Sequence, residues 1–158
     1  MKKFSIKVTT DKPEIIYGLP SYRGRITIGN FSERFIMPID SWTLNDYIDQ
    51  WQEAINKLKS CDRTCFVITA KTIEKNPLIE LWVLFREHNK IYFQNNFLIN
   101  DIAKEMDLPN LSDFSSATCY NYVEKKRHTL TESGTKISEW SISEEDFFES
   151  VKNMTSNT

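Results

Sequence analysis

The sequence of 158 residues has few of the residues that build common catalytic or metal sites. Its three cysteines, Cys61, Cys65 and Cys119, are an odd and small set. They cannot form a dense disulfide framework, so we expect reduced thiols in a cytoplasmic protein. No Cys or His pairs have the spacing of a structural zinc site, and the four glycines stand singly, unlike those of a phosphate-binding loop. We therefore expect no metal and no cofactor.

Long apolar runs are missing as well. Lys7 interrupts the first apolar stretch, so no secretory signal is expected. No window approaches the ~18 apolar residues that a membrane span needs. Charge of one sign is also missing, since 20 Lys and Arg face 22 Asp and Glu, a net charge of −2. Without a bulk positive field, neither nucleic acid nor a membrane surface is the expected partner.

What the chain does contain is enough apolar material for one core. Hydrophobic residues make up 40% and aromatics 13%, which excludes disorder. The length fits one domain. We expect it to span 1–158, with an N-terminal strand and loop over 1–23 and a C-terminal helix and frayed tail over 143–158.

The first half of the chain alternates strand and helix patterns. Alternating apolar residues predict a strand over 4–8, and the following stretch 13–24, which Pro and Gly interrupt, is expected to include a loop. A hairpin is expected over 25–38, with its turn at Gly29 and Asn30. Apolar residues at helical spacing then predict a helix from Thr43, as N-cap, to Leu58.

The second half predicts a buried strand over 64–70, a hairpin over 78–93 that turns at His88 and Asn89, and a short helix over 99–106. Residues 112–131 fit a strand or a packed loop. The segment 136–142 reads as a strand, and Ser143 as the N-cap of a last helix. The fold class is α+β, an antiparallel sheet with two or three packed helices, and its expected core includes Trp51, Ile55, Phe66, Ile68, Trp82, Leu84 and Phe93.

No catalytic constellation stands out. The chain has no Gly-x-Ser-x-Gly elbow, and Cys119 has no partner that the sequence identifies. The basic run 125–127 is typical of a solvated edge. A carboxylate pair could still serve a small hydrolase or transferase, and that alternative stays open.

Acidic residues are concentrated in three segments. Residues 40–53 hold four acids and no cation, residues 139–149 hold five acids and no cation, and residues 99–114 hold four acids and one lysine. On the predicted helix, Asp46, Asp49 and Glu53 are spaced to line one exposed strip. Such segments serve as solubilising surface or steer the protein toward a basic partner.

Several motifs resemble the immunity proteins of bacterial contact-dependent growth inhibition, the CdiI group. The resemblance extends from about residue 24 to 142. The stretches that carry it are Gly24–Phe35 (GRITIGNFSERF), Met37–Pro38, Ser41–Trp42, Asp46–Tyr47, Gln50–Trp51 and Gly134–Trp140 (GTKISEW). These residues are mostly Ile, Phe, Trp and Gly, which set a fold, so no binding role is assigned to Ile26, Trp42 or Trp51.

The resemblance implies a cytoplasmic, non-catalytic antidote. Such a protein binds the C-terminal toxin domain of a cognate exoprotein and blocks its active site or substrate path. Many of these toxins are nucleases, most often ribonucleases, whose basic clefts suit an acidic inhibitor. We expect a monomer bound 1:1 to toxin; a homodimeric structural protein that pairs through an edge strand is a further alternative. The residues expected to face the toxin are Asp46, Asp49, Glu53, Glu144, Glu145 and Asp146.

Overall fold

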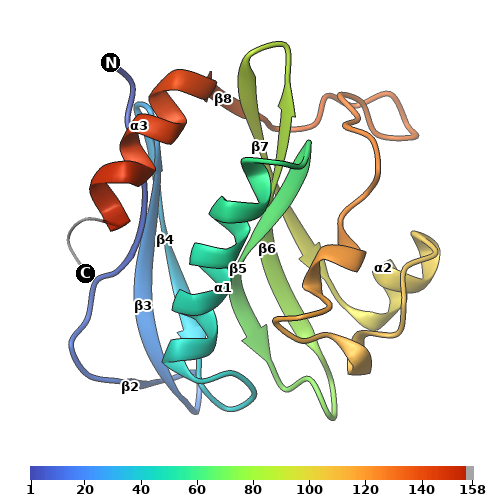
Figure 1. Cartoon of the computed structure of the whole chain (residues 1–158). Coiled ribbons are helices and arrows are strands. Elements are labelled where there is room, and N and C mark those ends of the chain that lie inside the picture. Colours follow the sequence, from blue (N-terminus) through green and yellow to red (C-terminus); the bar gives the residue numbers. More distant parts are fainter. Residues whose placement is uncertain (156–158) are drawn as a thin grey trace.

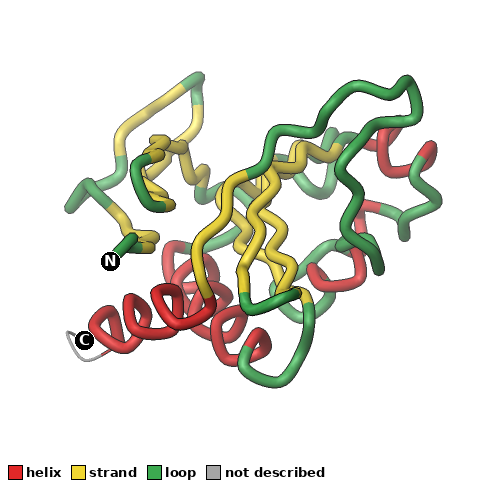
Figure 2. Tube along the Cα trace, turned by 90° about the horizontal axis from the view of Figure 1, so that it is seen from above, coloured by secondary structure: helices red, strands yellow, loops and turns green. Residues whose placement is uncertain are grey.

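The computed structural model describes residues 1–155, in which two antiparallel sheets lie next to each other (Figures 1 and 2). The strands of the first sheet are β1 (Phe4–Val8), β2 (Glu14–Ile16), β3 (Leu19–Ile28) and β4 (Phe31–Pro38). Those of the second are β5 (Arg63–Lys71), β6 (Leu78–Glu87), β7 (Lys90–Leu98) and β8 (Trp140–Ser143).

In the first sheet β3 is the central strand. It pairs with β1 and β2 along one edge of the sheet and with β4 on the other side. The second sheet runs in the order β5–β6–β7–β8, with a bulge in β5 between Val67 and Thr69. At that bulge the Thr69 hydroxyl donates to the Ile36 carbonyl at 2.6 Å, which ties the two sheets together at β4 and β5.

The helices are α1 (Leu44–Leu58), α2 (Asn100–Glu105) and α3 (Glu144–Thr155). Helices α1 and α3 lie on the same side of the two sheets (Figures 1 and 2). The segment from α2 to residue 139 lies on the far side of the second sheet from the first. It contains two short 3-10 turns, Leu111–Asp113 and Cys119–Tyr122. With this segment on one face and the core on the other, β5 is buried along Thr64–Ala70.

Phe4 of β1 joins the two sheets and α3 in one core. Its ring centroid lies 5.5 Å from those of Phe66 in β5 and Phe93 in β7, and 4.9 Å from that of Phe147 in α3. The seven expected core residues are all buried. The α+β class and the expected helices over 43–58 and 99–106 are confirmed.

The loop expected within 13–24 is reduced to a two-residue turn, because nearly all the rest of this stretch forms β2 and most of β3. Tyr17 and Gly18 both have positive φ and make a two-residue hairpin turn, the geometry that suits paired strands. Gly24 is no breaker either, since the Phe35 ring covers it and a Cβ there would lie 2.3 Å from the ring. This glycine makes room for an aromatic side chain within a strand.

The structure decides one open alternative and corrects two later expectations. Of the two readings of segment 112–131, the packed loop is confirmed, with 3-10 turns in it and no strand. The expected strand over 136–142 is reduced to β8, because residues 136–139 leave the sheet: Lys136 pairs only with Leu130, in an isolated bridge, and Glu139 contacts Arg127. Helix α3 continues to Thr155, so the first residues of the expected frayed tail are helical, and 156–158 lie outside the described residues.

The outer face of the first sheet carries a row of like charges. Arg25 of β3 lies opposite Lys7 of β1 on one side and Arg34 of β4 on the other. Within residues 1–155 none of these three side chains forms an ion pair. Like charges directly opposite each other destabilise a sheet, so the row weakens this face.

Candidate functional site

Helix α1 presents the first group of expected acids. The Thr43 hydroxyl accepts from the Asp46 backbone N–H at 3.1 Å, and the Asp46 carboxylate accepts from the Thr43 N–H at 2.8 Å. This capping box fixes the first turn of the helix. Asp46 is half-buried, whereas Asp49 and Glu53, about one turn further along each time, are exposed. The expected strip therefore exists on the outer face of α1.

The inner face of α1 holds the helix against the edge of β5. The Gln50 side chain accepts from the Val67 N–H and donates to the Cys65 carbonyl, both at 2.8 Å. The Trp51 indole donates to the Val67 carbonyl at 2.7 Å, and the Tyr47 hydroxyl accepts from the Ala70 N–H at 3.0 Å. These bonds satisfy edge groups that would otherwise be open to another strand. The acidic strip is thus mounted on a rigid support.

The second group of expected acids lies at the start of α3 and is partly engaged within the molecule. Glu144 forms an ion pair with Arg86, whose guanidinium also donates to the Leu58 carbonyl at 2.9 Å. Asp146 accepts from the Lys2 backbone N–H at 3.2 Å, and Glu145 is exposed.

The structure does not bring the two acidic groups together. The Arg86 contacts place the start of α3 beside the C-terminal end of α1. Asp46 lies in the first turn of α1, about 18 Å away along the helix axis at 1.5 Å per residue. The α1 acids and the α3 acids are separate surfaces.

An open hollow of about 740 Å³ adjoins the first turn of α1. Three acids line it, Asp40, Asp46 and Glu74, against one cation, Lys75. Within residues 1–155 none of these three acids takes part in an ion pair. Sequence reasoning missed Glu74, because only the β5–β6 turn brings it to this place.

The β2–β3 hairpin borders the same hollow through Leu19. At its tip the Tyr17 side chain is 87% exposed and Ile15 is 72% exposed. Sequence reasoning missed this tip, although the Tyr17–Gly18 pair was a possible signal of a hairpin turn. The hairpin end and the first turn of α1 lie at the same end of the molecule, at the bottom of Figure 1. The hollow adjoins both, since Leu19 and Asp46 line it.

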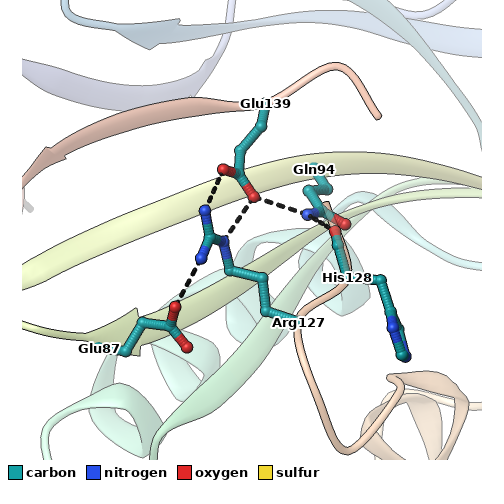
Figure 3. Close-up of polar contacts among 5 residues, drawn as sticks. All are labelled: Glu87, Gln94, Arg127, His128 and Glu139. Carbon is teal, nitrogen blue, oxygen red and sulfur yellow. Dashed lines mark hydrogen bonds and ion pairs between the residues drawn. The ribbon is translucent and has the colours of Figure 1, made fainter. Parts of the chain in front are cut away.

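A half-buried ionic network fixes the long loop that precedes β8 (Figure 3). Arg127 reaches Glu139 at 2.5 Å and Glu87 at 2.6 Å, and its guanidinium lies 3.6 Å from the centroid of the Tyr92 ring. Gln94 donates to the Glu139 carboxylate at 2.7 Å. Burial alone would raise the pKa of Glu139, but the hydrogen bonds from Arg127 and Gln94 outweigh it and lower that pKa. The run 125–127 is therefore not simply a solvated edge.

Groups that could act as nucleophile or base are poorly placed for catalysis. Cys65 and Cys119 are buried. A hydrogen bond to Cys119, together with burial, raises the pKa of the Cys65 thiol, which keeps it protonated and unreactive. His88 is exposed at a turn, and exposed His128 lies 3.4 Å from Glu124. Among residues 1–155 no group of three or more His, Cys, Asp or Glu could hold a metal ion. No helix in the same range is long and apolar enough to cross a bilayer.

These features define a class of protein: an α+β domain whose distinctive surface is an acidic helix face beside an exposed apolar hairpin. The family described as "CdiI N-terminal domain" matches residues 37–150. The chain therefore belongs to the CdiI family of immunity proteins, and it is not an enzyme.

One curated relative agrees with this assignment, and one solved structure shares the fold. The "Immunity protein CdiI" of Enterobacter cloacae subsp. cloacae is 29% identical over 132 residues, which cover 81% of this chain and 85% of the relative. A chain of the "CdiA-CT/CdiI toxin and immunity complex from Enterobacter cloacae" has the same fold, with a TM-score of 0.78 and 24% identity. That match covers 97% of this chain and 99% of the other.

Proposed function

We propose that this protein binds the C-terminal toxin domain of its cognate CdiA exoprotein in the cytoplasm and neutralises it as a 1:1 complex. The observation that carries the proposal is the CdiI family match over residues 37–150, which includes α1 and the whole of the second sheet. The solved complex of a CdiA-CT toxin with a CdiI protein supports the same partner. Inhibition is by occupancy, with no bond made or broken.

The toxin is proposed to be a nuclease, and a ribonuclease in particular. A nuclease cleft must attract phosphates, and an inhibitor that places carboxylates there competes with the substrate. Asp49 and Glu53 on the outer face of α1 suit that task because they are exposed and rigidly mounted. The toxin is then inhibited at its active site or along its substrate path.

Co-expression tests the proposal. The CdiA C-terminal domain encoded beside this gene is expressed with and without this protein. Growth should be arrested by the toxin domain alone and restored by the pair. Purified together, the two should elute as one species with the light-scattering mass of a 1:1 complex. Failure to bind and failure to protect would together refute the proposal.

Kinetics can separate the proposed toxin-facing acids. We propose Asp46, Asp49 and Glu53 on α1 and Glu144, Glu145 and Asp146 on α3 as two toxin-facing groups, and the α1 group is favoured because less of it is engaged within the molecule. The double variant Asp49→Asn/Glu53→Gln should associate roughly tenfold more slowly at low salt, with a weaker salt dependence.

The matched control for that variant is Asp101→Asn/Glu105→Gln, which removes the same charge from exposed positions on α2. Its association rate should stay near that of the wild type. Glu145→Gln tests the α3 group separately. Equal slowing by the α1 and α2 double variants would show that only net charge matters and would reject the α1 strip as a local contact.

A further inference from the structure

The tip of the β2–β3 hairpin is an apolar surface with no counterpart inside the molecule. Between Glu14 and Arg23 the chain has no charged residue, although charged residues make up 27% of the sequence. Ile15 lies across from Pro20, and Ile16 across from Leu19, so the apolar side chains gather at one end of the ribbon. Tyr17, at 87%, is the most exposed large hydrophobic side chain in residues 1–155.

The turn itself breaks a local preference. Tyr17 has a φ of 49° and Gly18 a φ of 80°. Two-residue turns of this kind favour Asn, Asp or Gly at the first position, because a bulky side chain at positive φ is strained. The choice of tyrosine therefore costs stability and gives no packing in return. Local rules are broken in this way mainly at functional sites.

The hairpin is also held in one position. The Ile39 N–H donates to the Pro20 carbonyl at 2.9 Å, and Ser21 pairs with Pro38 of β4. A side chain presented on a fixed turn loses little freedom on binding. Tyrosine is, with tryptophan and arginine, among the residues that most often dominate interface energetics.

The charge around the hairpin tip indicates what kind of partner covers it. The hollow beside the hairpin is lined by Asp40, Asp46 and Glu74 against the single cation Lys75. A partner that covers the tip must also face this negative hollow, so it needs an apolar depression bordered by basic side chains. A basic toxin domain has that chemistry.

We propose that Tyr17 and Ile15 are the apolar anchor of the toxin-docking surface, with the acidic hollow as its charged border; this rests on the function proposed above. The anchor supplies slow dissociation, and the acids supply fast association. Loss of the ring should therefore raise the dissociation rate, whereas neutralising an acid should lower the association rate.

The test measures binding of the same CdiA C-terminal domain to immobilised variants by biolayer interferometry. Tyr17→Asn removes the ring but places a turn-compatible residue at positive φ, so the variant should fold with unchanged or higher stability. Its Kd should rise roughly 30-fold or more, mostly through dissociation. Ile15→Thr, which keeps a β-branched residue in the strand, should weaken binding in the same direction.

Leu130→Asn is the matched control, since Leu130 is a 56% exposed side chain in a different loop. It should bind as tightly as the wild type. Wild-type affinity in both Tyr17→Asn and Ile15→Thr would overturn the anchor and leave the immunity function standing. A wild-type protein that does not bind the toxin domain at all would refute the proposed function and the anchor together.

Discussion

Arg127 shows how one side chain determines the course of a long loop. Its guanidinium bridges Glu87 on β6 and Glu139, which precedes β8, and covers Tyr92 on β7. These contacts attach the loop between the 3-10 turns and β8 to the strands β6 and β7. Both carboxylates are engaged by the one guanidinium, so this network serves to hold the fold together.

Acid should weaken this network in a defined window. The folded-state pKa of Glu139 is lowered from its ordinary value of 4.5, so its contribution to stability is complete above about pH 4.5 and disappears as the pH falls through the lower folded-state pKa. Urea unfolding at stepped pH should show this loss in the wild type. Glu139→Gln should be less stable than the wild type at neutral pH. On acidification it should lose less stability than the wild type does. An identical acid profile in both proteins would contradict this role.

At the scale of elements, the two faces of α1 differ in role: one face packs against β5 and the other is exposed to solvent. Tyr47, Gln50 and Trp51 supply the hydrogen bonds that close the edge of β5. Asp49 and Glu53 point away from the sheet and are exposed. The amphipathic spacing visible in the sequence predicts which face is buried, but not that a buried glutamine would replace a neighbouring strand.

Gln50→Met tests this replacement. The change keeps the approximate side-chain volume but leaves the Val67 N–H and the Cys65 carbonyl without their partner, which should cost about 2 kcal/mol or more of unfolding free energy. Chemical denaturation measures the loss. Gln52→Met on the exposed side of the same helix is the control and should stay within about 0.5 kcal/mol of the wild type. A loss no larger in Gln50→Met than in Gln52→Met would show that the edge does not depend on the amide.

The row of cations on the first sheet gives the opposite prediction, because removing one of them should increase stability. Arg25→Thr removes the charge that lies between Lys7 and Arg34, so stability should rise by about 0.5 kcal/mol at low salt. The gain should shrink in high salt as the repulsion is screened. Arg23→Thr is the control, because Arg23 lies 3.9 Å from Glu14 and its removal should bring no gain. A salt-independent loss in Arg25→Thr would mean that packing of its aliphatic stem matters more.

Most elements of this fold can be predicted from periodicity, because helices and strands that bury one face carry that spacing in the sequence. The helix from Thr43 and the hairpin at His88 are examples. Pro13, Gly18 and Gly24 misled the prediction of β2 and β3, since the same residues end one element and permit a turn or a close ring contact in another. The path of 107–139 depends on Arg127 and on contacts distant in sequence.

The proposed toxin-facing surface was less predictable than the fold. The helical spacing of Asp46, Asp49 and Glu53 was enough to place them on one strip. The separation of that strip from Glu144, Glu145 and Asp146 follows from tertiary packing, which no local pattern encodes. The joining of the hairpin to the hollow likewise depends on strand pairing between β3 and β4.

At the scale of the whole molecule, the two sheets share one core. Phe4 from the first sheet contacts Phe66, Phe93 and Phe147, so neither sheet can keep its apolar face covered without the other. We expect one cooperative unfolding transition, with coincident midpoints from tryptophan fluorescence and far-UV circular dichroism. Phe4→Ala should lower the free energy of unfolding by about 3–5 kcal/mol. Both midpoints should then fall together and remain coincident. Separate midpoints in the wild type would show that the sheets unfold independently.

The division of labour on α1 also bears on how such a protein evolves. Its inward side chains close the sheet, whereas the Asp49 and Glu53 side chains on the outer face form no hydrogen bond or ion pair within residues 1–155. Mutations at the outward positions can therefore accumulate in a lineage without unfolding the protein. Under the proposed mode of binding, substitutions at Asp49 and Glu53 can thus alter toxin recognition while the fold is kept.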